Sequence, residues 1–436
     1  MPDELPSDWI NGHWNTGATG QPAARSVIDK MEITYNEPKV ATEVEYLTPF
    51  VQRVLQIEDI TTGDPQKNYL ARYRGVLRGD SAAAYDQLAA SLRPLNITPL
   101  FRKEQDQHVV LLLPGVLNPS RSNPWINLGM FILTLASVIY AGAMYTYNGP
   151  QPASLLGELL APLYNWSSGL PFAISLLAIL VAHEFGHYLA GRYHHTHVTL
   201  PYFIPFPISP FGTMGAFIQL KEPPKNKRIL LDIGIAGPLA GMLVAIPVLL
   251  LGLSLSTVGP LNLAPGQGVQ MEGSSLLYLF SKFLIFHQML PAPATYGGLP
   301  PLLYWVRYFF TGQPLPLGGL DVHLNSIAWA GWAGLLVTAL NLIPAGQLDG
   351  GHVLYVLLGR RARALLPVIL MAMILLGLVW SGWWLWALLI FLLGRLYAEP
   401  LDQITPLDKP RKAVALLGLV ILVLVFTPVP LIIAGG

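Results

Sequence analysis

Cysteine is absent from this sequence of 436 residues. Disulfide bonds, iron–sulfur clusters and thiolate metal sites are therefore excluded, and a bound metal ion can be held only by histidine, aspartate or glutamate side chains. The first residues also lack the basic and apolar regions of a secretory signal and the arginine-rich character of a transit peptide. We therefore expect neither kind of targeting segment there.

Charge is also scarce. Asp, Glu, Lys and Arg together make up 12% of the chain, whereas hydrophobic residues make up 53%. This balance is too apolar for a soluble enzyme and predicts a protein of the lipid bilayer. The formal net charge of +1, without a long basic run, excludes a broad surface for nucleic acid.

The composition divides the chain into three parts. Residues 1–30 are rich in Gly, Pro, Ser, Asn and Asp without apolar periodicity, which predicts a flexible leader. Residues 31–118 predict a small soluble α+β accessory domain, and residues 120–436 contain the long apolar runs. The accessory domain shows no catalytic constellation, so we expect a binding or regulatory role. Its predicted elements are strands over Tyr69–Leu77, Ile97–Arg102 and His108–Leu113 and a helix over Ala82–Leu92.

Apolar stretches of roughly 20 residues, the length that crosses a hydrocarbon core of about 30 Å, recur after residue 120. Lys and Arg gather in alternate loops between them, as expected for cytoplasmic loops. The segment Leu276–Leu290 is shorter and contains Lys282 and His287, so we expect it to be interfacial or partly inserted. The sequence thus predicts an α-helical polytopic membrane protein with about seven spans, a cytoplasmic N-terminus and an outside C-terminus. The predicted spans are Trp125–Tyr147, Leu170–Tyr193, Ile229–Leu255, Asn325–Ile343, Ala364–Trp380, Leu385–Leu396 and Ala413–Leu431.

One long apolar segment cannot be a regular helix. Val198–Leu220 contains four prolines together with Gly212 and Gly215, and proline removes helical hydrogen bonds. Basic residues flank it on both sides, which predicts a re-entrant segment that enters the membrane and returns on the same side. Irregular backbone at membrane depth is tolerated where it is buried in protein or lines a wet cavity. We therefore expect such a cavity beside it.

The run His183-Glu184-Phe185-Gly186-His187 lies near the end of the second predicted span. On a helix, residues four apart share a face, so the two imidazoles can bind one metal ion, and Glu184 is close enough to act on a water molecule there. Zinc lowers the pKa of a bound water to about 7, and a carboxylate can take its proton. Ionisable residues inside a span are costly unless paired or bound to metal, which marks these three as functional candidates.

A third protein ligand is needed, and Asp349 is the best candidate. It directly follows the fourth predicted span, where Pro344 and Gly346 end the helix. The predicted topology places it at the same depth as His187, whereas the other acidic residues lie in basic loops or on the outer side. Its alternative role is to cap the helix that begins at Gly350.

These residues resemble the site-2 protease family of intramembrane zinc proteases. The family pairs HExxH in one span with an Asn/Pro-rich segment that ends in LDG, as in HEFGH at 183–187 and NLIPAGQLDGG at 341–351. Ile233–Pro238 resembles a third family element, although Gly241 stands where many members have asparagine. The accessory domain and the sequence VTALNLIPAGQLDGGH look closest to the ethylene-dependent gravitropism-deficient group of plant plastids and bacteria.

The resemblance implies one Zn²⁺ per chain bound by His183, His187 and Asp349, with Glu184 as the catalytic base. It makes residues 120–436 a transmembrane zinc protease domain. It also makes the Pro/Gly-rich segment a membrane-inserted, β-like element along which a substrate lies extended, with Gly212, Gly215 and Phe217 as substrate-binding candidates. From their positions, His323, His352 and Asn341 could orient the metal ligands or bind substrate. Of these, Asn341 is the substrate-binding candidate, and His352 is the best candidate for orienting the ligands.

The expected activity is hydrolysis of peptide bonds within or near transmembrane segments, as in regulated intramembrane proteolysis. The expected partners are the bilayer and single-span or other transmembrane substrates, without nucleic acid. We expect a multi-pass protein of a bacterial plasma membrane, with a plastid or thylakoid membrane as the alternative.

Other interpretations remain open at this point. A zincin of another membrane family would complete the site with a glutamate, and a catalytically inactive chaperone or a zinc transporter of similar fold would have no protease activity. A cluster of three histidines after the second span could form a second metal site, although we expect headgroup-level residues there. The glutamates in question are Glu222, Glu272 and Glu399, and the histidines are His194, His195 and His197.

Overall fold

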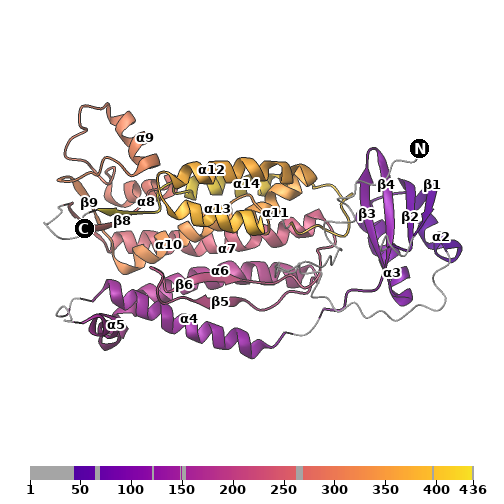
Figure 1. Ribbon diagram of the computed structural model, residues 1–436, viewed down its shortest axis with the longest axis horizontal. Helices are drawn as coiled ribbons and strands as arrows, with labels where there is room; N and C mark the ends of the chain where they lie inside the picture. Colours follow the sequence, from indigo (N-terminus) through magenta and orange to yellow (C-terminus); the bar gives the residue numbers. More distant parts are fainter. Residues whose placement is uncertain are drawn as a thin grey trace, which may run out of the picture.

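The computed structural model describes residues 44–63, 69–119, 122–147, 149, 154–261, 269–394 and 397–434. Figure 1 shows a bundle of helices that run along the long axis of the molecule, with a small α+β domain at one end and a cap of short strands and helices at the other. The predicted leader, residues 1–30, and the predicted start of the accessory domain lie outside the described residues.

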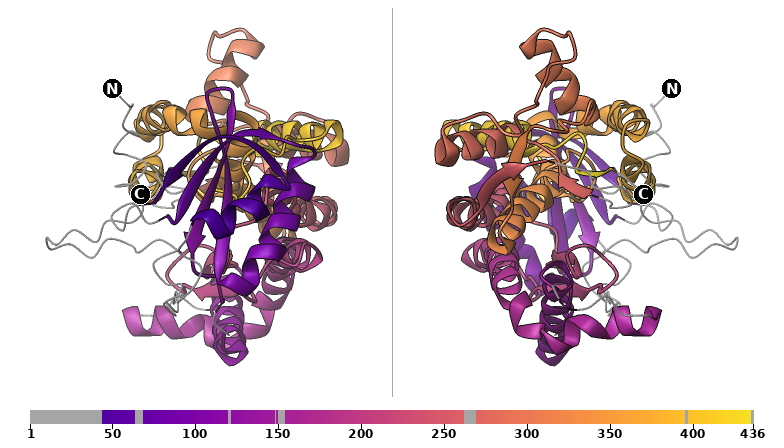
Figure 2. Two further views of the ribbon diagram at one scale, coloured as in Figure 1. Left: turned by 90° about the vertical axis from the view of Figure 1, so that its right-hand side faces the viewer. Right: turned by 90° about the vertical axis from the view of Figure 1, so that its left-hand side faces the viewer.

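The α+β domain is a four-stranded antiparallel sheet packed against two helices, as the end-on view in Figure 2 shows. The predicted strands and helix are present, because alternating apolar residues bury one face of the sheet and the Asp80 carboxylate caps the helix at the Ala83 amide. The sheet order is β1-β2-β4-β3, so β3 is an edge strand. The elements are α2 (Val44–Gln52), β1 (Leu55–Thr62), β2 (Ala71–Leu77), α3 (Ser81–Leu92), β3 (Ile97–Glu104) and β4 (Gln107–Pro114).

Among the residues that the structure describes, three helices of the bundle are long and apolar enough to cross a membrane. They are α4 (Pro124–Tyr145), the continuous stretch Trp166–Tyr193 that includes α6 (Leu170–Tyr193), and α7 (Lys227–Ser254). The other bundle helices are shorter and stand beside them in Figure 1. These are α10 (Ser326–Asn341), α11 (Asp349–Leu358), α12 (Leu366–Gly377), α13 (Gly382–Leu393) and α14 (Lys409–Val425).

Helices α6, α7 and α10 form the centre of the bundle and share one apolar core. Glycines allow their backbones to approach closely, as is common between membrane helices. A Cβ atom at Gly186 of α6 would lie 2.5 Å from the Ala236 carbonyl oxygen of α7, and one at Gly331 of α10 would lie 2.6 Å from Leu249 Cα. The close packing fixes α6 and α10 against the same stretch of α7.

The Pro/Gly-rich segment forms an antiparallel hairpin of β5 (Tyr202–Pro205) and β6 (Thr213–Phe217). Polar side chains of α4 hold it: the Asn127 amide donates to the carbonyls of Leu200 and Pro201, and the Ser137 hydroxyl donates to the Gly212 carbonyl. In the described part of the chain β6 pairs with β5 alone, so its other edge is unpaired. The predicted β-like segment is thus a hairpin with one free edge.

The cap contains two short two-stranded sheets and two helices. Lys282, predicted at the interface, is 1% exposed in its core and pairs with Glu272 at 2.9 Å and Asp321 at 3.0 Å. The elements are β7 (Thr257–Pro260), β8 (Val269–Glu272), α8 (Leu276–Phe286), α9 (Pro301–Thr311), β9 (Leu320–His323) and β10 (Leu431–Ala434), while α5 (Leu155–Tyr164) lies at the same end of the bundle in Figure 1.

Candidate metal centre

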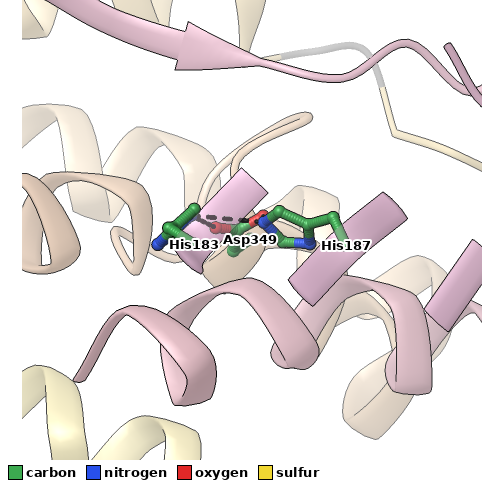
Figure 3. Close-up of side chains that lie close together, drawn as sticks. All are labelled: His183, His187 and Asp349. Atoms are coloured by element: carbon green, nitrogen blue, oxygen red, sulfur yellow. Dashed lines mark hydrogen bonds and ion pairs between the residues drawn. The ribbon is translucent and has the colours of Figure 1, made fainter. Parts of the chain in front are cut away.

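The two histidines of the HExxH run lie one turn apart on α6, and Asp349 meets them from the first residue of α11 (Figure 3). His183 Nε2 lies 3.2 Å from one Asp349 oxygen, and His187 Nε2 lies 3.3 Å from the other. The two Nε2 atoms are 3.2 Å apart. Residues 166 positions apart in the sequence therefore direct three donor atoms at one point.

These separations fit a tetrahedral zinc ion. Zinc binds histidine nitrogen and carboxylate oxygen at about 2.0–2.2 Å, so two ligands of a regular tetrahedron lie about 3.3–3.6 Å apart. The three observed distances are 3.2, 3.2 and 3.3 Å, at or just below the lower end of that range. The donor set is also right, because two imidazoles and a carboxylate leave one coordination position open for a reactant, as catalytic zinc sites do.

Asp349 does not cap its own helix. The residue at the N-cap position of α11 is Leu348, and no side chain caps this helix end. The left-handed Gly346 (φ 57°) lies against Gly394, and Gly350 packs against the Leu342 carbonyl, which together fold the chain tightly back toward α6. The turn thus directs the Asp349 carboxylate at the histidines.

His187 is oriented by α7. Its Nδ1 lies 2.7 Å from the Ile233 carbonyl oxygen, so Nδ1–H donates there and Nε2 carries the free lone pair. Gly237, one turn further along α7, leaves room for the ring, because a Cβ atom at this position would lie 2.0 Å from Nε2. Gly241 faces His183 in the same way, with 3.1 Å from a built Cβ to Nδ1. These small residues of α7 form the floor of the site. The sequence did not predict this role for them.

Glu184 is 4% exposed and lies between the histidines and the hairpin. Its carboxylate interacts electrostatically with both histidines and with the backbone amide of Ile218, the residue after β6. The end of β6 therefore lies close to the carboxylate that is predicted to act as base.

The other predicted site residues fall into two groups. Asn341 lies at the metal centre, with its amide nitrogen 3.3 Å from His183 Nε2. His352 lies one turn after Asp349, packs against Gly234, and has a buried Nδ1 without a hydrogen-bond partner among the described residues. The hairpin residues are further from the metal.

Gly212, Gly215 and Phe217 shape the hairpin. Both glycines have positive φ angles, 71° and 98°, which other residues rarely adopt. A Cβ atom at Gly212 would also lie 2.5 Å from the Ser137 carbonyl oxygen, whereas one at Gly215 would meet nothing within 4 Å. Phe217 is half exposed and stacks on Tyr202 across the hairpin.

The alternative ligands lie elsewhere. Glu222 pairs with His197, Glu272 with Lys282, and Glu399 with Arg363. His194 pairs with Asp232, which also binds Arg411, so it serves an ion-pair network at the helix ends. Within the described ranges His183, His187 and Asp349 are the single group of three or more such residues close enough to share a metal ion.

Comparison with known proteins agrees with this site. Residues 171–380 match the model of Peptidase family M50, a stretch that runs from the start of α6 through the hairpin and Asp349 to the turn after α12. No solved structure matches the chain.

Two curated relatives from Arabidopsis thaliana carry informative names. "Probable zinc metalloprotease EGY2, chloroplastic" is 28% identical over 86% of this chain and 63% of its own length. "Probable zinc metalloprotease EGY1, chloroplastic" is 29% identical over 73% of this chain and 56% of its own length. The chain thus spans between 56% and 63% of the length of these relatives.

The predicted resemblance is confirmed by these matches, which cover the residues that build the metal centre. The HExxH helix, the hairpin and the LDG turn all fall inside the matched stretch. Residues 171–380, a little under half of the chain, thus match Peptidase family M50, in agreement with the predicted resemblance to the site-2 proteases.

Proposed function

We propose that this protein is an intramembrane zinc metalloprotease that hydrolyses peptide bonds within or near the transmembrane segments of other membrane proteins. The observation that carries the proposal is that the two imidazoles and the Asp349 carboxylate lie within 3.2–3.3 Å of one another, beside the buried Glu184. The family match and the names of the relatives support zinc as the metal.

When bound at this centre, zinc supplies a Lewis acid that polarises a carbonyl group and acidifies water. The protein's own residues transfer protons and stabilise developing charge. Glu184 is placed to accept the proton of the attacking water on a carboxylate oxygen and to return it to the leaving amine. Asn341, whose amide group lies at the edge of the site, can donate to the oxygen on which negative charge develops.

The hairpin provides a place for the substrate. A helical peptide bond is shielded and hydrogen-bonded within its own helix, so a substrate must unwind locally before cleavage. Its freed amides and carbonyls then need partners, which an unpaired strand edge offers. We propose that the substrate lies along β6, with Gly212 and Gly215 shaping the strand and Phe217 contacting substrate side chains, and that the strand ends next to Glu184.

For the membrane topology, we propose seven crossings and a hairpin that enters and leaves on one side. Each of the three long helices would cross the membrane by its own length. The shorter helices α10, α12, α13 and α14 would each need flanking residues to complete a crossing. The N-terminal domain and the metal centre would then lie toward the cytoplasmic side. The names of the relatives support a plastid membrane, the alternative being a bacterial plasma membrane.

An inactive chaperone and a zinc transporter are less well supported. An inactive relative would not need a carboxylate at Glu184, and this residue is present and buried beside the histidines. A transporter would need acidic or histidine residues in several helices near mid-membrane, whereas α12, α13 and α14 contain none.

Cleavage of a single-span substrate by purified protein in nanodiscs tests the proposal. Glu184→Gln removes the base and keeps the size of the side chain, so the rate is expected to fall by roughly 10²–10⁴-fold while zinc content stays near one ion per chain. Glu222→Gln, on the exposed His197 pair, is the matched control and should cleave normally. Full activity of Glu184→Gln would refute the proposed mechanism.

A further inference from the structure

One short segment connects the α+β domain to the bundle. We call Glu399–Thr405, between α13 and α14, the docking segment. The Phe101 amide of edge strand β3 donates to the Leu401 carbonyl at 3.0 Å, and the Gln403 amide donates back to the Phe101 carbonyl at 3.0 Å. This is a parallel bridge, by which the docking segment extends the edge of the sheet.

The side chains at this junction are buried and paired. Asp402 is 0% exposed, and its carboxylate accepts hydrogen bonds from the Ser81 hydroxyl and from the Ile404 and Thr405 amides. Arg102 is 7% exposed and donates to the carbonyls of Phe101, Pro400 and Leu401. Separation would break the bonds that cross the junction, from Ser81 to Asp402 and from Arg102 to Pro400 and Leu401, which is costly for buried polar groups.

Apolar contacts strengthen the same junction. Leu401 and Ile404 of the docking segment pack against the core of the α+β domain. The core of this domain is therefore completed by residues that lie about 300 positions away in the sequence. The domain is seated on the docking segment by both hydrogen bonds and apolar packing.

The opposite edge of the docking segment forms backbone hydrogen bonds with the residues that precede α7. The Leu401 amide donates to the Pro224 carbonyl at 3.0 Å, and the Asp402 amide donates to the Lys225 carbonyl at 2.7 Å. The next residue, Asn226, caps α7. Lys225 also pairs directly with Asp86 of the α+β domain at 3.0 Å.

Along the chain, residues 224–226 connect two segments that contribute to the metal centre. Before them, the chain leaves β6 and passes the amide of Ile218, which contacts Glu184. After them, α7 begins and within two turns supplies the Ile233 carbonyl that orients His187. A third link leads to α11, because Glu399 pairs with Arg363 in the 3₁₀ turn that follows the helix of Asp349.

We propose that the α+β domain is a positioning domain for the protease site, with its own docking segment as the partner. By holding residues 224–226 through Arg102 and Asp402, the docked domain fixes β6 against Glu184 and the first turns of α7 against His187. Arg102 and Asp402 are positioning residues that act through this junction. The consequence for cleavage depends on the proposed function, whereas the mechanical coupling does not.

Hydrogen–deuterium exchange on the full-length protein in nanodiscs tests the coupling without a substrate. In Arg102→Met and Asp402→Asn, peptides that cover residues 213–226 are expected to exchange roughly tenfold faster, because buried hydrogen bonds of the junction are lost. Peptides of β2 and β4 should stay protected, and zinc should stay bound. Arg93→Met, which removes an exposed arginine of the same domain, is the matched control and should leave residues 213–226 unchanged.

An unchanged exchange rate over residues 213–226, together with an opened docking segment, would overturn the proposal. A second measurement covers the case in which a variant unfolds the sheet. A protease site inserted between Gly115 and Asn123 of the wild-type chain allows the domain to be cut from α4. The proposal predicts that the cut domain stays bound during gel filtration, and its release would contradict the proposal.

Cleavage assays then separate the two claims. With a single-span substrate, Arg102→Met is expected to lower kcat/KM at unchanged zinc content, and Arg93→Met is not. Equal kcat/KM in all three proteins would show that the coupling does not position the site. A wild-type chain without any protease activity would refute the proposed function and would leave the exchange result intact.

Discussion

At the scale of single residues, the metal centre depends on glycines that leave room for the metal ligands as much as on the ligands themselves. Gly237 and Gly241 of α7 lie beneath the two imidazoles, and each would approach a ring if it carried a Cβ atom. The Ile233 carbonyl fixes the His187 tautomer through Nδ1. These contacts prepare the Nε2 atoms for the metal before it binds.

Gly237→Ala is expected to weaken zinc binding. Its Cβ atom would lie 2.0 Å from His187 Nε2, so the ring must rotate away from Asp349. Changes to groups that orient a metal ligand cost about 10–100-fold in affinity, and displacing the ligand itself should cost at least as much. Competition with a fluorescent zinc chelator measures this, with Gly129→Ala as control because a Cβ atom there meets nothing within 4 Å. Equal affinities in the two variants would contradict this role of Gly237.

At the scale of elements, the hairpin is held by α4 and by two glycines in left-handed conformations. Gly212→Ala combines strain at φ 71° with a contact of 2.5 Å to the Ser137 carbonyl oxygen. We expect it to destabilise the hairpin by about 1–3 kcal/mol and to lower kcat/KM with unchanged zinc content.

The matched control for the hairpin is Gly298→Ala. Gly298 has a similar φ of 78° but lies in the cap, where a Cβ atom meets nothing within 4 Å. It should carry a similar backbone strain without affecting cleavage. If the two variants cleaved a single-span substrate equally well, the hairpin would have no part in substrate binding.

The cap depends on a buried charge network. Lys282→Met would leave the carboxylates of Glu272 and Asp321 buried without their cation, and breaking a buried pair in this way typically costs about 3–5 kcal/mol. Thermal unfolding should shift down markedly, whereas Lys412→Met, at an exposed lysine, should have little effect. An unshifted transition for Lys282→Met would show that the network does not stabilise the cap.

The sequence allowed some elements to be predicted and not others. His183 and His187 lie four residues apart, so helical periodicity alone places them on one face. The turn that carries Asp349 could be found because proline and glycine mark its start. By contrast, the burial of Lys282 and the role of Arg102 depend on partners 10 to about 300 positions away, which no local pattern reveals.

Membrane spans were predicted from apolar length, and this works best for helices without breaks. Trp166–Tyr193 and α7 are 28 residues long and match their predicted spans closely. After residue 360, α12 ends at Gly377, before the end of its predicted span, and α14 ends at Val425, ahead of Pro428 and Pro430. For these helices, apolar composition predicts insertion but not helix length.

At the scale of the whole molecule, the α+β domain lies at one end of the bundle and the cap at the other (Figure 1). Because the chain has no cysteine, single introduced cysteines can report this arrangement. Arg93→Cys and Arg361→Cys should react with an impermeant maleimide from the same side of the membrane, and Tyr296→Cys from the opposite side. Labelling of Arg361→Cys and Tyr296→Cys from one side would refute the proposed crossings.

The account as a whole depends on a carboxylate from α11 and two imidazoles from α6 holding one zinc ion. X-ray absorption at the zinc edge, combined with metal analysis, tests this most directly. We predict one zinc ion per chain with only nitrogen and oxygen ligands at about 2.0–2.2 Å, and loss of most bound zinc in Asp349→Ala. Full zinc occupancy with an unchanged spectrum in Asp349→Ala would contradict the assignment of this residue as the third ligand.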